Sequence, residues 1–483
     1  MADRLHVRRR IGDVETPVGA LLKLGPDTPG TFLFESIVGG ERLGRYSFIG
    51  HDPMNWLQVK DHRCATSASG DFSETSNDAV ILDVSPTDAL RRYAETAADV
   101  TTDSEDLPPM ASGAFGYVGY DFIQYVEPVR IESKDVLSVP DALLVIPRLV
   151  VIFDHLYQEI LLVARFSEDE EKAASTYLDS IEQRLDMPAP MPPRWGTDAV
   201  SQTTEFASNT TKARYFEMVQ AAREYTRAGD IFQVVPSQRL SAASPARSIS
   251  VYRALRRLNP SAFMFHMNLG DIQLVGSSPE ILVRVRDGRV AIRPIAGTRP
   301  RSGDAAEDAR RAADLLADEK EVAEHLMLLD LGRNDVGRVA AYGSVEVTEQ
   351  YIIERYSHVM HIVSHVEGDL REGLTAVDAL LAGFPAGTVS GAPKIRAMQI
   401  IDELESERRG IYGGAVGYFG WNGDMDTCIA LRTAVIKDGM LHLQAGGGVV
   451  LDSDPQYEYD ETLHKIGALK RAADWAPQFE HDQ

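Results

Sequence analysis

Short alternating runs joined by tight turns recur along most of this 483-residue chain, and single helical stretches separate them. A clear example is residues 281–295, ILVRVRDGRVAIRPI, in which Asp287 and Gly288 supply the positive φ angles of a tight hairpin turn. Residues 211–230, TKARYFEMVQAAREYTRAGD, instead have apolar side chains at helical spacing, and this pattern ends at a glycine. Hairpins interleaved with single helices predict an α+β fold, with antiparallel sheets and helices packed outside them.

A proline-rich stretch divides the chain into two regions. Between Met187 and Arg194 there are four prolines, which leave no continuous donor pattern for a helix or a strand. We therefore predict a linker at residues 187–205. It would separate an amino-terminal region, residues 1–186, from a larger region, residues 206–483.

Composition restricts the class of protein. A hydrophobic content of 44% and a charged content of 25% are typical of a soluble globular protein. The net charge of -23 argues against general affinity for nucleic acid or for an anionic membrane. Cys64 and Cys428 form neither a metal-binding spacing nor a disulfide framework, and the amino terminus lacks the apolar core of a signal peptide. We expect a cytoplasmic protein.

Three glutamates are candidates for a metal site. A helix expected from Ala306 to about Leu331 places Glu321 and Glu324 on one face, and Glu461 lies in another expected helix near the end of the chain. Carboxylate oxygens suit Mg²⁺, which takes one or two protein carboxylates and completes its shell with water and substrate oxygens. Glu324 and Glu461 are a candidate pair. The alternative is that both face solvent, as glutamates on helices usually do.

Glycines mark two candidate binding loops. Gly446, Gly447 and Gly448 lie between two expected strands, where consecutive N–H groups either hold an anion or belong to a flexible turn. The loop that starts at Ala296 has the sequence AGTRPR and offers a hydroxyl and two arginines suited to carboxylates or phosphates. Its alternative is a basic surface loop. His361 lies in an alternating apolar run, and its default interpretation is a core histidine.

Taken together, these segments resemble the chorismate-utilising enzymes, and most closely the anthranilate synthase component I family. The amino-terminal third matches in FLFESIVGGERLGRYSFIG and GAFGYVGYD. From about residue 210 onwards the matches run in family order, and several are long and nearly free of gaps: GDIFQVVPSQR, SSPEILVR, PIAGTRPR, EHLMLLDLGRNDVGRV, VMHIVSHVEG, FPAGTVSGAPKIRAMQIIDELE, RRGIYGGAVGYF, MDTCIALRTAV and QAGGGVVLDSDPQYEYDET. The resemblance implies one catalytic fold, in which two antiparallel sheets are sandwiched between outer helices.

The resemblance also implies roles for individual residues. Glu324 and Glu461 would bind Mg²⁺, and Glu321 would orient the metal shell. Glu280 would protonate the departing C4 hydroxyl of chorismate, assisted by His361. The implied substrate-binding residues are Gly446, Gly447, Gly448 and Lys465 for the ring carboxylate, Tyr412 and Arg432 for the enolpyruvyl carboxylate, and Gly297 and Thr298 for the ring.

Two positions bear on the nucleophile. Similar aminodeoxychorismate synthases have a lysine in a PIKGT version of the opening loop, whose amine attacks covalently, and this chain has Ala296 there. Isochorismate and salicylate synthases have a water-activating lysine in the GDIFQVV region, where this chain has neutral Gln233. With both lysines absent, the expected nucleophile is ammonia, which needs placement and dry surroundings. The family obtains ammonia from a separate glutamine amidotransferase, so a hetero-oligomer is expected.

The expected reaction is the synthesis of anthranilate from chorismate, with addition of ammonia at C2, loss of the C4 hydroxyl and loss of pyruvate. One alternative is an enzyme that makes aminodeoxychorismate or stops at aminodeoxyisochorismate. A non-enzymatic alternative is a sensor of chorismate or tryptophan on an inactive enzyme fold. The presence of both metal carboxylates and Glu280 disfavours a sensor.

A regulatory site is also implied by the resemblance. In similar anthranilate synthases, the serine of a Leu-Leu-Glu-Ser motif and a Pro-Tyr-Met stretch line a tryptophan site away from the chemistry. The matching residues here are Ser36, Ala262, Phe263 and Met264, with Phe34 in place of a leucine. We therefore expect feedback inhibition by tryptophan, with an apolar slot for the indole and acceptors near the serine. The alternative is that the serine caps a turn.

Overall fold

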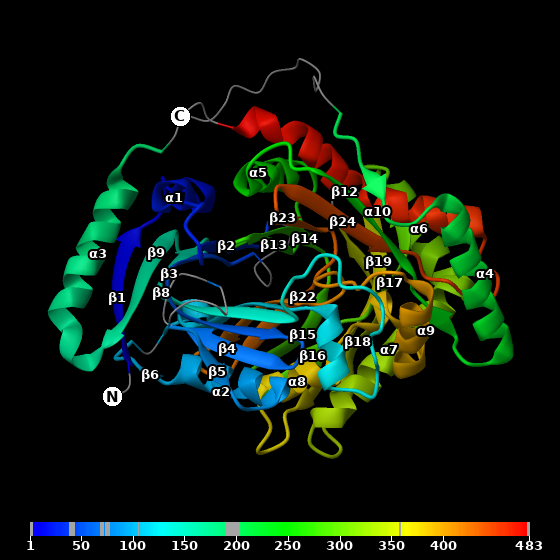
Figure 1. The fold of residues 1–483 in the computed structure, drawn as a ribbon, viewed down its shortest axis with the longest axis horizontal. Coiled ribbons are helices and arrows are strands. Elements are labelled where there is room, and N and C mark those ends of the chain that lie inside the picture. Colours follow the sequence, from blue (N-terminus) through cyan, green and yellow to red (C-terminus); the bar gives the residue numbers. More distant parts are fainter. Residues whose placement is uncertain are drawn as a thin grey trace.

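The computed structural model describes residues 3–37, 44–67, 72, 78–104, 106–189, 203–356 and 359–480. Two large antiparallel sheets with helices on their outer faces make up most of the molecule (Figure 1). The predicted α+β class is confirmed. Most of the predicted linker lies outside the described residues. No helix in the described part of the chain is both long and apolar enough to cross a membrane.

The first sheet combines strands from both ends of the chain. Strand β2 of the amino-terminal region pairs with β13 of the carboxy-terminal region, so the two regions share this sheet. Along its ladders the order is β10 (Ala207–Ser208), β12 (Ser237–Ala243), β24 (Met440–Gly446), β23 (Thr433–Lys437), β14 (Ile272–Ser278), β13 (Phe263–Leu269), β2 (Phe32–Glu35), β3 (Tyr46–Lys60), β8 (Ala142–Asp154), β9 (Glu159–Ser167), β1 (Asp3–Ile11) and β6 (Val100–Thr101).

The second sheet reuses two of these strands and carries the expected hairpin of residues 281–292. Its order is β5 (Val80–Leu82), β4 (Arg63–Ser67), β3, β8, β7 (Gly113–Val118), β21 (Ala415–Gly420), β22 (Met425–Ile429), β15 (Ile281–Arg286), β16 (Arg289–Ile292) and β19 (Val359–Asp369), which also pairs with β17 (Ile295–Pro300) and β18 (Glu346–Arg355).

The long strands β3 and β8 pass through both sheets. Residues 48–50 of β3 pair with β2 in the first sheet, and residues 56–60 pair with β4 in the second. Between them the register shifts at Pro53, which lies opposite Pro147 of β8. Proline has no N–H to donate to a ladder and is found in sheets at edges and bulges. The two prolines therefore mark the bend at which the strands leave one sheet and join the other.

Buried side chains form three layers. Phe32, Phe115 and Phe265, from strands of both sheets, belong to the middle layer between the sheets. The outer layer on the first sheet packs under α1 (Pro17–Leu24), α3 (Glu171–Asp186), α5 (Ser248–Leu258) and α10 (Pro455–Trp475), and that on the second packs under α2 (Pro86–Ala98), α7 (Glu319–Val339) and α8 (Ala376–Gly383). Burial of each of these phenylalanine side chains stabilises the folded state by about 1.5–3 kcal/mol.

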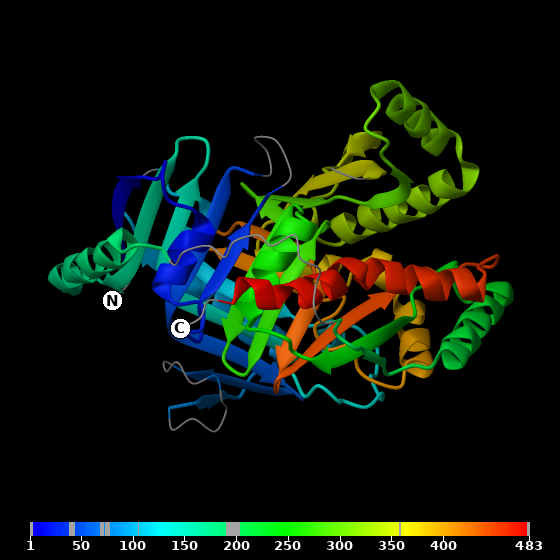
Figure 2. The same cartoon turned by 90° about the horizontal axis from the view of Figure 1, so that it is seen from above.

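The helix predicted from Ala306 to about Leu331 is two helices, α6 (Ala305–Ala317) and α7. Asp318 separates them with an extended backbone, and its side chain accepts hydrogen bonds from the N–H groups of Lys320 and Glu321. An aspartate that caps a new helix in this way ends the previous one. Seen from above, α6 and α7 lie at the opposite end of the molecule from α3, and α10 runs across the middle towards that end (Figure 2).

Candidate active site

The opening loop forms a bulge at the edge of the second sheet. The register of β17 against β19 shifts between Ala296 and Thr298, and Gly297 between them has a φ of 68°, which favours glycine. A Cβ at Gly297 would lie 3.1 Å from Oε2 of Glu321. Glycine thus permits both the bulge and the close approach of a carboxylate. The methyl group of Ala296 is buried, with 8% of the residue exposed.

His361 of β19 packs against this bulge and not within the apolar core. Its Nδ1 lies 2.9 Å from the carbonyl oxygen of Gly297 and 3.1 Å from Oγ1 of Thr298. A carbonyl oxygen can only accept, so Nδ1 carries the proton and Nε2 is left as an acceptor. Burial lowers the pKa of His361, and Arg432 lowers it further against the hydrogen bond to Gly297, so the ring is neutral at pH 7.

Glu280 lies in the turn between β14 and β15 and is a carboxylic acid at neutral pH. Burial raises its pKa to about 8, against the opposing effects of Thr388, Arg432 and Lys465. The Thr388 hydroxyl donates to Oε1 of Glu280 at 3.1 Å. Thr388 was not predicted, although it lies within the FPAGTVSGAPK segment. A protonated carboxyl group held this way can act as a general acid.

Arg432 brings an uncompensated positive charge close to Glu280. Its φ of 47° is uncommon for a residue with a side chain, and such backbone strain tends to occur at binding sites. Burial lowers the pKa of Arg432, and Glu280 partly opposes that effect. Among the described residues, none forms an ion pair with the Arg432 guanidinium. A desolvated cation without a counterion is costly, and this one is suited to an anionic ligand.

Carboxylates from α7 and α10 gather beside this region. Burial raises the pKa of Glu324, and Glu321 and Glu461 add to the effect against a hydrogen bond from Gln233 Nε2 to Glu324 Oε1 at 3.2 Å. Burial also raises the pKa of Glu458 to about 7, with a further contribution from Glu461. Glu458 was not predicted, although its spacing of three residues from Glu461 places both on one helix face.

These carboxylates have the chemistry of a Mg²⁺ site. Lys465 is a weak counterion, with Nζ 3.4 Å from Glu461 Oε1, so the charges that raise the pKa of Glu324 and of Glu458 are not fully compensated. In the described ranges, no three His, Cys, Asp or Glu side chains converge closely enough to hold an ion unaided. Two glutamates with water and substrate oxygens would complete an octahedral shell, which is how Mg²⁺ is usually bound. The residues present therefore fit the metal.

The glycine run lies directly against this carboxylate cluster. A Cβ at Gly447 would lie 2.9 Å from Glu458 Oε2, and one at Gly448 would lie 2.6 Å from Gln233 Nε2. The N–H of Gly447 donates to the backbone carbonyl of Pro236, and the carbonyl of Gly446 accepts from Lys465 Nζ at 2.9 Å. Glycine is thus required here because side chains on other elements approach the backbone. Tyr412 is buried nearby, and burial raises its pKa to about 12.

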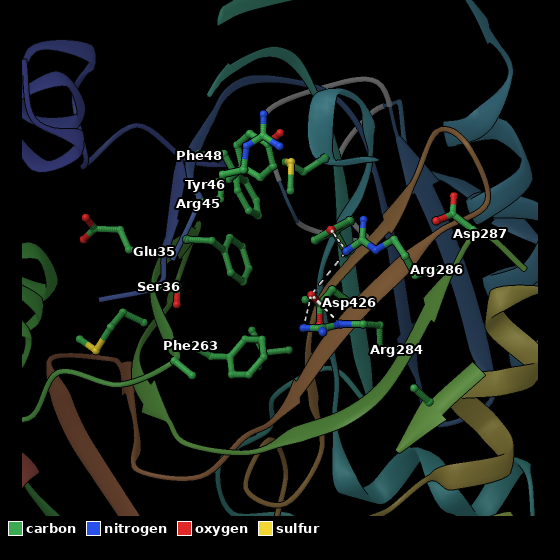
Figure 3. Close-up of a pocket in the computed structure, with 18 of the residues that line it drawn as sticks. Glu35, Ser36, Arg45, Tyr46, Phe48, Phe263, Arg284, Arg286, Asp287 and Asp426 are labelled. Atoms are coloured by element: carbon green, nitrogen blue, oxygen red, sulfur yellow. Dashed lines mark hydrogen bonds and ion pairs between the residues drawn. The ribbon is translucent and has the colours of Figure 1, made fainter. Parts of the chain in front are cut away.

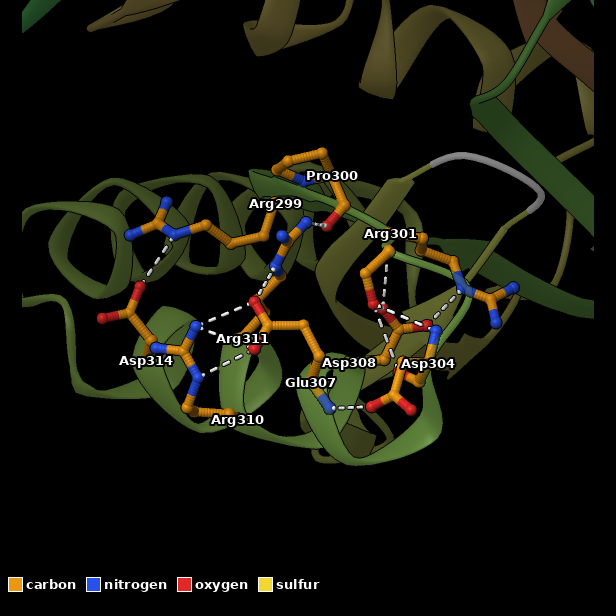
Figure 4. A network of polar contacts seen from close by, with 10 residues as sticks. Arg299, Pro300, Arg301, Asp304, Glu307, Asp308, Arg310, Arg311 and Asp314 are labelled. Carbon is orange, nitrogen blue, oxygen red and sulfur yellow. Dashed lines mark hydrogen bonds and ion pairs between the residues drawn. The ribbon is translucent and has the colours of Figure 1, made fainter.

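The two arginines of the opening loop bind the chain's own carboxylates (Figure 4). Arg299 pairs with Asp314 of α6, and Arg301 pairs with Asp308 at 2.9 Å. Arg299 also pairs with Asp318 and Glu321 at the start of α7. Their forked donors are therefore engaged within the protein. They fix α6 and the start of α7 against β17.

The residues predicted for a tryptophan site line a separate cavity of about 570 Å³ between the sheets (Figure 3). Ser36 and Phe263 lie on one side, and Arg284 and Asp426 lie on the other. Ala262 and Met264 also line the cavity. The Ser36 hydroxyl oxygen and Oδ1 of Asp426 are buried without a hydrogen-bond partner in the described structure. The charged wall was not predicted. None of the metal-site glutamates lines this cavity.

Comparison with known proteins identifies the family. Residues 52–471 match the family model described as chorismate binding enzyme. A protein from Cereibacter sphaeroides named anthranilate synthase component 1 is 50% identical over 98% of this chain and 94% of its own length. The crystal structure of anthranilate synthase component I from Streptococcus pneumoniae covers 96% of this chain and 99% of that chain, with a TM-score of 0.78 and 36% identity. The menaquinone-specific isochorismate synthase of Escherichia coli, at 20% identity, covers 97% of this chain and 94% of that chain with a TM-score of 0.71 and shows the fold alone. The chain belongs to the chorismate binding enzyme family, on the branch of the anthranilate synthase component 1 proteins.

Proposed function

We propose that this chain is the large subunit of an anthranilate synthase and converts chorismate and ammonia to anthranilate, pyruvate and water. The observation that carries the proposal is the pairing of a protonated acid with an unpaired cation, Glu280 beside Arg432. A substrate with two carboxylates and a hydroxyl leaving group requires both. The relatives named anthranilate synthase component 1 support the same activity.

The chain's residues would divide the reaction into binding and proton transfer. Arg432 and Tyr412 would hold the enolpyruvyl carboxylate and leave the C4 hydroxyl towards Glu280. Glu280 donates its proton to that hydroxyl, which departs as water while ammonia adds at C2 and the ring double bonds shift. Loss of the C2 proton and of the enolpyruvyl group as pyruvate then produces the aromatic ring. The free Nε2 of neutral His361 is suited to help relay these protons.

Glu324 and Glu461 would hold Mg²⁺ against the ring carboxylate of chorismate, with Glu321 and Glu458 around them. Bound there, the ion would neutralise that carboxylate and stabilise charge that develops on the ring. The protein's contribution is to bring carboxylates of α7 and α10 into one region, and to prevent a side chain from crowding Glu458 and Glu461 at Gly447.

The identity of the nucleophile depends on two neutral residues. Ala296 has no amine to attack the ring, and the amide of Gln233 is hydrogen-bonded to Glu324 and cannot act as a base. Both observations favour free ammonia over water or a lysine. The alternatives are the synthesis of aminodeoxychorismate and release of the amino intermediate, aminodeoxyisochorismate.

The direct test is incubation of the purified chain with chorismate, Mg²⁺ and an ammonium salt. Anthranilate, detected by its fluorescence, is the expected product. Accumulation of a non-aromatic amino compound would favour the alternatives, and binding of chorismate without turnover would favour a sensor.

Lysine at position 296 is expected to depress ammonia-dependent anthranilate formation. The long side chain of Ala296→Lys would fill the space of the nucleophile and add a competing amine, at a position that pairs with Ile362 next to His361 in β19. Ala296→Gly is the matched control, because it keeps that space free, and it should retain turnover. Rates at saturating ammonium check both variants, and a parental rate for Ala296→Lys would contradict this role of the alanine.

Ammonia is scarce as a free base at neutral pH, so a donor is needed. We propose a separate glutamine amidotransferase subunit, as the name component 1 of the relatives suggests. The expected result is that glutamine supports anthranilate formation only when that subunit is added, whereas ammonium supports it without the subunit.

The cavity between the sheets is proposed to bind tryptophan as a feedback inhibitor. Phe34, Phe263 and Met264 offer an apolar slot for an indole, and the unpartnered oxygens of Ser36 and Asp426 offer acceptors for an ammonium group. Two ligands bound to one chain at separate sites must influence each other's affinity reciprocally.

Phenylalanine at position 36 should weaken inhibition by tryptophan without slowing the uninhibited enzyme. A hydrogen bond to a charged group is worth about 1.5–3 kcal/mol, so loss of the Ser36 acceptor should raise the half-inhibitory concentration by about ten- to a hundredfold. The measurement is turnover against tryptophan concentration for the parent and for Ser36→Phe. Equal inhibition of the two proteins, or a parent insensitive to millimolar tryptophan, would contradict the proposed site.

A further inference from the structure

Arg409 is the most deeply buried arginine next to the candidate active site, with 2% of the residue exposed. Its guanidinium donates to the carbonyl oxygen of Val389 at 2.6 Å and to that of Val235 at 2.6 Å. It also forms a two-bond contact with Glu405, at 3.1 Å and 2.5 Å. The same group lies 5.5 Å from the centre of the Tyr412 ring. The guanidinium lies closer still to the centre of the Tyr120 ring, at 4.7 Å, so one side chain contacts four segments that are distant in the sequence.

Three of these segments carry a group of the candidate site. Val235 lies two residues after Gln233, which donates to Glu324. Val389 follows Thr388, which donates to the acid Glu280. The third contact is the ring of Tyr412 itself. Arg409 thus connects the metal side, the acid side and the carboxylate-binding side of the site.

The backbone around Arg409 reinforces this connection. Strands β11 (Gln233–Val234) and β20 (Gly391–Ala392) form a separate two-stranded sheet, and the N–H of Val235 donates to the carbonyl of Ser390. The guanidinium binds the carbonyls just beyond this ladder, on both strands. On the other side, Glu405 accepts from the N–H of Ser237 at 2.7 Å, where β12 begins. The ion pair closes the end of the small sheet.

Only an arginine can make this set of contacts. Its planar fork presents donors in fixed directions, whereas a lysine ammonium is a point charge on a flexible stem. A buried ion pair is a weak source of stability but a strong constraint on geometry when every partner is satisfied. The Arg409 ion pair constrains the local geometry in this way, because two carbonyls and one carboxylate accept hydrogen bonds from its guanidinium.

We propose that Arg409 is a positioning residue, which holds Tyr412 and the segments bearing Gln233 and Thr388 in the one arrangement that binds and protonates the substrate. The inference rests on the proposed chorismate chemistry. It adds a buried residue that contacts neither substrate nor metal and acts through three groups that do.

The test compares Arg409→Lys with Arg239→Lys. Arg239 is a matched control, because it is also buried, with 3% of the residue exposed. It lies on β12 and pairs with Glu407, and within the described part of the chain it forms no hydrogen bond with Tyr412 or Thr388. Both variants should unfold at lower temperature than the parent. Arg409→Lys should lower kcat by about a hundredfold, as small displacements of reacting groups do. It should also weaken Mg²⁺-dependent chorismate binding by about tenfold in calorimetry. Arg239→Lys should leave kcat and chorismate binding unchanged.

A second variant covers the case in which Arg409→Lys does not fold. Glu405→Gln keeps an acceptor for Ser237 but weakens the hold on Arg409, and it should lower kcat and chorismate affinity in the same direction. Equal losses in the Arg409 and Arg239 variants, or parental kcat and binding in Glu405→Gln, would overturn the inference. If the parent binds chorismate but makes no anthranilate, the proposed function fails, and the calorimetric comparison still decides the role of Arg409.

Discussion

Glu461→Ala is expected to abolish anthranilate formation and to leave the fold intact. A metal-coordinating carboxylate supplies several kcal/mol of charge stabilisation in the transition state. Its removal should therefore lower kcat by at least about 10³-fold. Little stability should be lost, because Glu461 is half-buried and its ion pair is a 3.4 Å contact with Lys465 on the same helix. The measurements are turnover at saturating Mg²⁺, Mg²⁺ binding by calorimetry and thermal unfolding.

Asp460→Ala is the matched control for this variant. It removes a carboxylate from the neighbouring position of α10, where Asp460 accepts a hydrogen bond from Gln456 and not from any group of the site. We expect parental turnover and Mg²⁺ affinity. Near-normal turnover of Glu461→Ala at saturating Mg²⁺ would remove Glu461 from the metal site.

Glu280→Gln should lower kcat by about 10²–10⁴-fold, the usual contribution of a general acid. The pH dependence gives the sharper test. A carboxyl group with a pKa of about 8 holds its proton below that pH, so the kcat of the parent should fall as pH rises through about 8. Glutamine does not titrate, so this fall should be absent from the residual activity of Glu280→Gln.

Thr388→Val provides the control for this assignment. The hydroxyl of Thr388 lowers the pKa of Glu280, so its removal should move the fall in kcat to higher pH while Glu280 remains the acid. A basic limb that stays in place in both variants would assign the proton to another group.

The elements that sequence predicted best are those set by neighbouring residues. The hairpin at Asp287-Gly288 and the helix from Lys212 to Ala228 follow from turn chemistry and apolar spacing, and the structure contains both. The joint between the sheets could not be predicted, because Pro53 and Pro147 gain their meaning only from lying opposite each other across two distant strands. The break at Asp318 was missed because apolar spacing continues through it, and only the capping contacts reveal it.

For the candidate active site, too, residue types could be predicted from the sequence but charge states and partners could not. Glu280, Glu324 and Arg432 could be selected by residue type and resemblance, but their charge states depend on burial that a sequence does not contain. Arg299 and Arg301 had the right chemistry for a substrate anion, and the structure pairs them with helix α6 instead. The likeness in fold to an isochorismate synthase illustrates why fold alone does not decide the reaction.

The cavity between the sheets and the candidate active site share strand β19, which carries His361 of the site and His365 of the cavity wall. A separation of four residues along a strand spans about 13 Å. An extended strand is stiff along its axis, so a ligand that displaces one part of the strand would also displace the residues further along it. Such a ligand would lower turnover without contacting the substrate, and bound substrate would in turn weaken the binding of that ligand. The pair joined in this way is His361 and His365, which both lie in β19, with His365 lining the cavity.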